Sequence, residues 1–277
     1  MKKAGQQYWQ ILPLGPTGYG DSPYQSVSTF AGNPYFIDLE ELIKKELLTK
    51  EECEACDWGG SESYVDYEKI YLSRYKLLRK AYEKADLKTD PDYAEFLKEE
   101  KDWLQDYCLF MAIKNDQKGI CWIDWPEELK DRHSKAVKEA EKELAEEIEF
   151  YRFQQYCFTT QWRKLKAYAN KKDISIIGDV PIYVALDSSD AWANPEMLQF
   201  DEDYDPKAVA GCPPDAFSAT GQLWGNPLYD WKALKKDGYG WWVQRMTHCL
   251  ELYDVVRIDH FRGFDEYYAI PYGVQNC

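Results

Sequence analysis

The segment Val255–Phe264 places a β-strand pattern directly in front of a cluster of charged residues. Two β-branched residues lead into Arg257 and Asp259, and His260 follows at once. A buried strand that ends abruptly in charge is typical of a parallel β/α barrel, which presents catalytic carboxylates at the carboxyl ends of its strands. Arg257 and Asp259 are two residues apart, so a strand points both to the same side. An arginine beside a carboxylate favours its ionised form, as a nucleophile at a sugar carbon requires.

Two further segments have the character of strands. Tyr8–Leu14 reads as a short buried strand, and a loop of turn residues, 15–26, follows it. Ile174–Val184 reads as a second strand, and Asp179 lies near its end. Because helical segments separate these strands, parallel pairing is expected, and the ends of parallel barrel strands meet at one mouth.

The segments between these strands are predicted to be mainly helical. An amphipathic helix is expected over Asp38–Leu48, a helical region over Glu51–Ala169, and a helix over Tyr239–Leu252. We expect breaks in the long helical region at three residues: Pro91, Gly119 and Pro126. The charged run from Lys135 to Glu149 is typical of a solvated helix face. Asp187–Leu228, rich in Pro, Gly and Asp, is expected to be a long functional or mobile loop.

Composition narrows the possible partners and the compartment. The formal net charge of −15 argues against binding to nucleic acid or to anionic membranes, and 16% aromatic residues would suit a neutral sugar. No apolar signal core or membrane-spanning run is seen, so a cytoplasmic protein is expected. The eight scattered cysteines, including Cys277, are read as reduced thiols, and the Cys53–Cys56 pair lacks the second CxxC of a metal site.

Seven motifs together resemble the 4-α-glucanotransferases, also called amylomaltases or disproportionating enzymes, of glycoside hydrolase family 77 in the α-amylase superfamily. The motifs, which span almost the whole chain, are Trp9–Ser26, Phe30–Tyr35, Gly178–Val184, Trp192–Pro195, Gly211–Asp215, Gly221–Tyr229 and Arg257–Gly263. The resemblance implies an α/β fold, a partial (β/α)8 TIM barrel (about strands 2 to 4) with a large α-helical insertion. The expected domains are 1–50, the start of the barrel, 51–150, the helical insertion, and 151–277, the rest of the barrel with an active-site loop.

The resemblance also assigns roles position by position. Asp259 matches the nucleophile that forms the glucosyl-enzyme ester, and Arg257 matches the arginine that orients it. Asp179 matches a carboxylate that borders the donor sugar. The remaining matches are expected substrate contacts: Ser22, Tyr24, Asp215, Phe217, Gln222 and Trp224. His260 is equally well read as a substrate contact or as a polar residue satisfied by the protein. No metal and no cofactor are implied, because a carboxylate does the covalent work.

The implied reaction moves an α-1,4-glucan segment between maltooligosaccharides, or to glucose as acceptor, by a retaining mechanism. That mechanism needs an acid/base carboxylic acid as well as the nucleophile. In the family this glutamate lies on a later strand than the nucleophile, and Glu266 is too close to Asp259 to match it. We therefore expect a fragment truncated at both ends that is inactive alone. The alternatives are an α-amylase-like hydrolase and a non-catalytic glucan-binding remnant.

Overall fold

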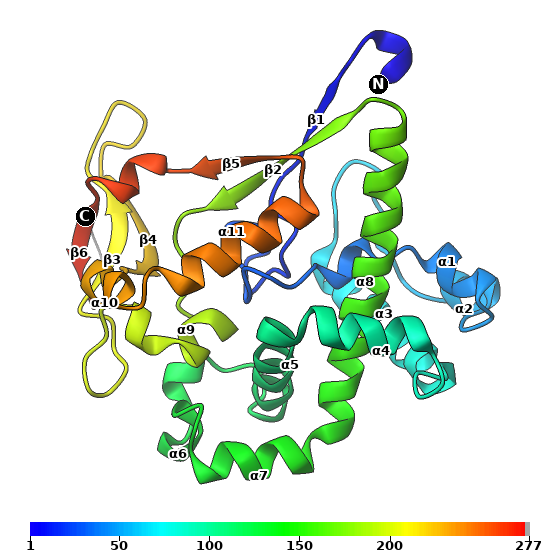
Figure 1. Cartoon of the computed structure of the whole chain (residues 1–277), viewed down its shortest axis with the longest axis horizontal. Helices are drawn as coiled ribbons and strands as arrows, with labels where there is room; N and C mark the ends of the chain where they lie inside the picture. Colours follow the sequence, from blue (N-terminus) through cyan, green and yellow to red (C-terminus); the bar gives the residue numbers. More distant parts are fainter. Residues whose placement is uncertain (275–277) are drawn as a thin grey trace.

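A computed structural model describes residues 1–274. These residues form an α/β fold that consists of two three-stranded sheets and a group of helices (Figure 1). The first sheet has the order β1-β2-β5 and is parallel throughout. The second has the order β4-β3-β6 and is antiparallel. Cys277, whose thiol state we predicted, lies outside the described residues.

The parallel sheet consists of β1 (Tyr8–Gln10), β2 (Ser175–Pro181) and β5 (Val255–Asp259). Its middle strand, β2, is the buried one, with Ile176 fully buried and Val180 5% exposed. Helices separate the three strands along the chain, as parallel pairing requires. The predicted parallel arrangement of these segments is therefore confirmed, and the three carboxyl ends point the same way.

The prediction that the outer two strands are buried is wrong. β1 covers Tyr8–Gln10 and not the whole of the predicted segment, and Tyr8 is 55% exposed. Val255 in β5 is 42% exposed. Both strands lie at the edges of a three-stranded sheet, so their outer sides have no neighbouring strand in the described chain.

The antiparallel sheet lies largely within the segment that we expected to be a long loop. β3 (Ala208–Cys212) pairs with β4 (Gln222–Pro227) on one side and with β6 (Tyr268–Pro271) on the other. Two short helices precede it, α9 (Ser189–Ala193) and the 3-10 helix η4 (Pro195–Met197). The expectation of a long loop over 187–228 is wrong, because β3 and β4 lie within this segment. The functional role expected of the segment stays a prediction.

Helices form most of the remaining structure. The 3-10 helices are η1 (Lys2–Ala4), η2 (Pro34–Phe36), η3 (Trp122–Asp124) and η5 (Phe261–Phe264). The first α-helices are α1 (Leu39–Lys44), α2 (Lys50–Glu54), α3 (Tyr67–Lys84), α4 (Pro91–Glu99), α5 (Lys101–Asp116) and α6 (Glu127–Lys130). The others are α7 (Lys135–Glu143), α8 (Ala145–Lys171), α10 (Trp231–Lys236) and α11 (Gly240–Leu252).

The predicted breaks in the helical region are confirmed, each with a local cause. Pro91 is the first residue of α4, where its missing N–H costs nothing, and the Asp90 carboxylate caps that helix. Gly119 adopts a left-handed φ of 79° just after α5. Pro126 precedes the short helix α6. The domain division that we placed at residue 150 falls within α8 and stays a prediction.

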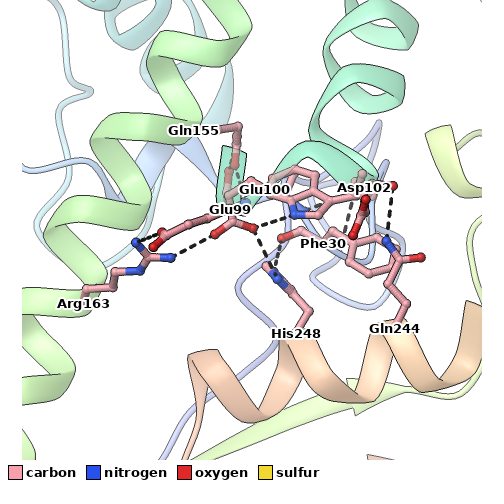
Figure 2. A network of polar contacts seen from close by, with 12 residues as sticks. Phe30, Glu99, Glu100, Asp102, Gln155, Arg163, Gln244 and His248 are labelled. Carbon is pink, nitrogen blue, oxygen red and sulfur yellow. Dashed lines mark hydrogen bonds and ion pairs between the residues drawn. The ribbon is translucent and has the colours of Figure 1, made fainter. Parts of the chain in front are cut away.

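Helix α11 is joined to the helical region by a buried polar network (Figure 2). His248 of α11 contacts the Phe30 carbonyl, with 2.8 Å between Nε2 and O, and its Nδ1 lies 3.7 Å from Oε2 of Glu100. Glu100, between α4 and α5, also accepts hydrogen bonds from Trp103 and from Arg163 of α8. The network therefore connects the helix that leads into β5 with three other parts of the chain.

Two further predictions concern the state of the cysteine thiols and the presence of a membrane-spanning segment. Among the described residues, free thiols include those of Cys53, Cys56, Cys108, Cys121, Cys157 and Cys249. None of the helices in residues 1–274 combines the length and the apolar character that a membrane crossing demands.

Candidate functional site

The three predicted charged side chains, Asp179, Arg257 and Asp259, meet at the carboxyl ends of β2 and β5. Asp179 and Arg257 are register partners across these strands, and Pro181 is the partner of Asp259. Gly178 lets β2 pack closely here, because a Cβ at this position would lie 2.2 Å from the Tyr253 ring. The local packing thus fixes the strand end that carries Asp179.

Arg257 joins the two carboxylates of the site. Its Nη1 donates to both oxygens of Asp179 at 2.6 Å, and its Nη2 donates to Oδ1 of Asp259 at 2.7 Å. The hydrogen bond to Asp179 is the main cause that raises the pKa of Arg257. One guanidinium therefore orients both carboxylates, as its planar set of donors allows. The structure brings these three predicted residues together.

Tyr24 extends this group from the loop that follows β1. Its hydroxyl donates to Oδ2 of Asp179 at 2.7 Å, across 155 residues of sequence. Burial, and then the hydrogen bond to Asp179, raises the pKa of Tyr24 to about 12. The phenol therefore remains a hydrogen-bond donor throughout the neutral range. We predicted Tyr24 as a substrate contact, and the structure shows that its hydroxyl also has a partner within the protein.

The site is buried at one end and open at the other. The Asp179 side chain is 3% exposed, whereas those of Arg257 and Asp259 are 46% and 41% exposed. A cavity of about 40 Å³ lies beside Asp179 and Tyr24 and is also lined by Tyr183 and Arg245. A carboxylate that is held by an arginine yet reaches solvent is accessible to a substrate.

Trp224, Gln222 and His260 form a second part of the site. The Trp224 ring meets the His260 ring edge-on with 4.9 Å between centroids, and the indole N–H donates to Oε1 of Gln222 at 2.9 Å. Burial lowers the pKa of His260. Its Nε2 atom is buried without a hydrogen-bond partner in residues 1–274. We left two alternatives open for His260, a substrate contact and a polar residue whose hydrogen bonds the protein satisfies. The unpaired Nε2 atom argues against the second alternative.

Ser22, Asp215 and Phe217 have other surroundings. Ser22 accepts a hydrogen bond from the Tyr24 backbone N–H at 3.3 Å and shapes that turn. Asp215 accepts from the backbone N–H groups of Phe217 and Ser218, both at 2.8 Å, and these bonds lower its pKa. Phe217 is 96% exposed in the β3–β4 loop. The structure shows how Asp215 organises this loop, and the predicted contacts of these residues with glucan stay predictions.

Sequence reasoning missed the residues that fasten the loops around the site. Gln25 donates to the Trp224 carbonyl at 3.1 Å and to Oδ1 of Asn226 at 3.0 Å, so it joins the loop after β1 to β4. Asn226 donates in turn to the Val184 carbonyl at 2.8 Å. Gln25 and Asn226 both lie inside the family motifs given above, and this position was the signal in the sequence that could have identified them. Arg245 contacts the end of β2 from α11, where nothing in the sequence distinguishes it from a solvated cation.

A larger cavity than the one beside Asp179 lies elsewhere in the described residues. It has a volume of about 610 Å³ and lies between the segment that starts with β1 and the outer face of α8. Its lining is mainly apolar, with Leu12, Trp162, Leu165 and Tyr168 among the contributors. The clustered charged groups lie at the strand ends, so we place the candidate site there.

No group of three or more His, Cys, Asp or Glu side chains within residues 1–274 has the arrangement to hold a metal ion. The chemistry that the site itself offers is that of carboxylates oriented by an arginine. Such a site can provide a nucleophile to an electrophilic carbon.

A family model described as 4-alpha-glucanotransferase matches residues 1–277. The chain is 52% identical over 274 residues to a 4-alpha-glucanotransferase of Clostridium butyricum, covering 99% of this chain and 56% of that protein. It is 49% identical over 275 residues to one of Thermus thermophilus, covering 98% and 54%. The chain therefore spans about half the length of these curated relatives.

The structure also resembles an amylomaltase from Streptococcus agalactiae that was solved in complex with acarbose. The TM-score is 0.93 at 40% sequence identity, covering 98% of this chain and 55% of that chain. The fold is therefore shared over nearly the whole of the present chain.

Proposed function

Because the chain belongs to the 4-alpha-glucanotransferase family, we propose that it supplies the nucleophile side of a site that transfers α-1,4-glucan segments between maltooligosaccharides. The observation that carries this proposal is the Tyr24–Asp179–Arg257–Asp259 group at the ends of β2 and β5. In this proposal the parallel sheet is part of a (β/α)8 barrel, about its second to fourth strands, and the protein works in the cytoplasm.

The first chemical step is a displacement at the anomeric carbon of the donor. An oxygen of Asp259 attacks this carbon, the bond to the leaving glucan oxygen breaks, and that oxygen takes a proton from a carboxylic acid. Arg257 holds Asp259 in line for the attack. In the second step the 4-hydroxyl of an acceptor sugar, or of glucose, attacks the same anomeric carbon, the bond from this carbon to Asp259 breaks, and the hydroxyl proton returns to the acid/base group.

The remaining predicted residues are proposed to bind the sugars around this centre. Asp179 and Tyr24 border the donor glucose, and His260, Gln222 and Trp224 line its open side. Ser22, Asp215 and Phe217 are proposed to complete the glucan groove, with the loop of Phe217 as a cover against water. The acarbose complex of the Streptococcus agalactiae relative supports an oligosaccharide ligand of this kind.

An α-amylase-like hydrolase would use the same ester, and the 41% exposure of Asp259 gives water a path to it. The products distinguish the two functions. A transferase makes oligosaccharides longer than the substrate, whereas a hydrolase makes only shorter ones.

An activated donor tests the nucleophile without the acid/base group. With α-maltosyl fluoride the C–F bond breaks without a proton donor, so Asp259 can form the ester directly. We expect mass spectrometry of the acid-quenched chain to show one added maltosyl group, mapped to Asp259 and missing from Asp259→Asn. Circular dichroism first establishes that both proteins are folded. A folded chain that takes up no maltosyl group, or that takes it up at another residue, would contradict the proposal.

A further inference from the structure

Arg245 is a buried cation that lies behind the site. It comes from α11, is 1% exposed, and donates from Nη1 to the Ile182 carbonyl at 2.9 Å. Its Nη2 donates to the carbonyl of Pro181. The Tyr229 hydroxyl donates to the same Ile182 carbonyl at 2.8 Å and lies 3.4 Å from Nη1 of Arg245. The guanidinium thus holds two successive peptide oxygens at the end of β2.

Burying the charge of Arg245 in these surroundings costs free energy. Its hydrogen-bond partners within residues 1–274 are neutral oxygens, and its guanidinium carbon lies 5.4 Å and 4.9 Å from the ring centroids of Trp241 and Trp242. The buried carboxylate of Asp190 interacts electrostatically with this charge, but no hydrogen bond joins the two side chains within residues 1–274. A buried charge without a hydrogen-bonded counter-ion costs more free energy than an apolar side chain of similar volume. Packing alone would therefore be served better by an apolar residue such as methionine.

The position of Arg245 connects the two strands that carry the carboxylates. Pro181 and Ile182 follow Asp179 by two and three residues, and Pro181 is the register partner of Asp259. Helix α11, which carries Arg245, leads after Leu252 directly into β5. Arg245 therefore joins the end of β2 to the helix that precedes the nucleophile strand.

We propose that Arg245 is a positioning residue for glycosyl transfer, which acts through the Pro181 and Ile182 carbonyls to hold Asp179 in register with Arg257 and Asp259. This inference rests on the proposed function, because it gives Arg245 a part in forming the ester at Asp259. Lysine cannot replace it, since a single ammonium does not span both carbonyls and does not stack flat on indole rings.

The test compares Arg245→Lys and the milder Tyr229→Phe with the unsubstituted chain. Arg74→Lys is the matched control, because Arg74 of α3 likewise donates to a backbone carbonyl, that of Ile37 at 2.6 Å, and lies 5.5 Å from the ring centroid of Trp58. Two quantities are measured: amide hydrogen exchange of the segment 178–184, and the rate at which α-maltosyl fluoride labels Asp259 over a range of donor concentrations.

We expect faster exchange confined to the end of β2 and a maximal labelling rate that is roughly 10- to 100-fold lower in Arg245→Lys. The donor concentration for half-maximal rate should change little, because the loss is in the reacting geometry. Tyr229→Phe should show a smaller effect in the same direction, and Arg74→Lys should show neither effect.

Two results would overturn the proposal: unchanged exchange at 178–184 in a folded Arg245→Lys protein, or faster exchange there with an unchanged labelling rate. The second result would mean that Arg245 only stabilises the fold. If the unsubstituted chain is not labelled at Asp259, the proposed function fails, and the exchange measurement still decides whether Arg245 holds β2.

Discussion

At the scale of single residues, Arg257 is the side chain on which the geometry of the site depends. It contacts both oxygens of Asp179 and one oxygen of Asp259, and its own side chain is 46% exposed. We expect Arg257→Lys to remain folded and to label Asp259 with α-maltosyl fluoride roughly 100-fold more slowly, because one ammonium cannot orient two carboxylates at once. Mass spectrometry over time measures this rate.

Arg262→Lys is the control for this change. Arg262 is a neighbouring arginine, 75% exposed, that pairs with Glu266 at 3.0 Å. Such an exposed ion pair contributes little to stability, so Asp259 of the control variant should be labelled at the same rate as in the unsubstituted chain. Equal labelling rates in Arg257→Lys and Arg262→Lys would show that the bridging contacts of Arg257 do not matter for the reaction.

The sequence predicted part of this residue-scale geometry. The spacing of Arg257 and Asp259 places both on one side of a strand, and the structure confirms it with their 2.7 Å contact. The hydrogen bond from Tyr24 to Asp179 could not be read from spacing, because it joins residues 155 positions apart. The role of Arg245 was hidden for a related reason, since a cation on an amphipathic helix ordinarily faces solvent.

At the scale of elements, the attachment of α11 should depend on pH through His248. The Phe30 carbonyl can only accept, so Nε2 carries the proton and the bare Nδ1 faces Glu100. Burial lowers the pKa of His248 from its ordinary 6.5, so folding favours the neutral ring. This stability is fully present above pH 6.5 and is lost as the pH falls through the lowered pKa of the folded state.

The expected result is that His248→Gln loses less unfolding free energy than the unsubstituted chain when the pH falls from 7.5 to 5.5. Glutamine can still donate to the Phe30 carbonyl but does not titrate. Urea unfolding at several pH values measures the difference. Burial raises the pKa of Glu100, which acts in the opposite sense and is common to both proteins, and the nearby Glu251 and Arg163 are also unchanged.

His133→Gln is the control, because His133 is exposed. It should follow the pH dependence of the unsubstituted chain. If His248→Gln instead follows the pH dependence of the unsubstituted chain, the buried imidazole does not contribute to the pH dependence of stability.

Which elements could be predicted depended on the range of their contacts. The parallel strands have compact apolar patterns, and helices separate them, so their pairing followed from local signals. The antiparallel sheet did not, because β3 pairs with β6 some sixty residues later in the sequence, as in Val209 with Ile270. Its short strands lie among Pro and Gly residues, whose turn character outweighed the strand pattern.

At the scale of the whole molecule, the apolar cavity beside β1 should make the chain bind hydrophobic probes. This cavity of about 610 Å³ borders the edge strand of the parallel sheet, and Leu12 and Leu165 in its lining are 60% and 41% exposed. Exposed apolar surface next to an open sheet edge favours association. We expect Leu12→Lys/Leu165→Lys to reduce the fluorescence of bound anilinonaphthalene sulfonate and to reduce self-association in light scattering.

Leu72→Lys is the comparison for the double variant, since Leu72 is 61% exposed on α3 and does not line the cavity. It should leave the probe fluorescence nearly unchanged. A double variant that binds the probe as well as the unsubstituted chain would place the apolar binding surface elsewhere.

The carboxylates of the described chain also determine what the 277-residue polypeptide can catalyse. A retaining mechanism needs an acid/base group about 5 Å from the nucleophile. Asp179 shares Arg257 with Asp259, but both of its oxygens accept hydrogen bonds from this arginine, and a proton donor would not be held in that way. Glu266 is 71% exposed and paired with Arg262. Neither is placed to protonate a leaving sugar.

We therefore expect the purified polypeptide to be labelled by α-maltosyl fluoride yet to produce no maltotetraose from maltotriose, because only the natural substrate needs a proton donor. Chromatography of the sugars after long incubation measures this, with the fluoride labelling of the same sample as proof that the nucleophile side is intact. Production of longer oligosaccharides by the polypeptide, abolished in Asp259→Asn, would show instead that a carboxylic acid within this chain completes the mechanism.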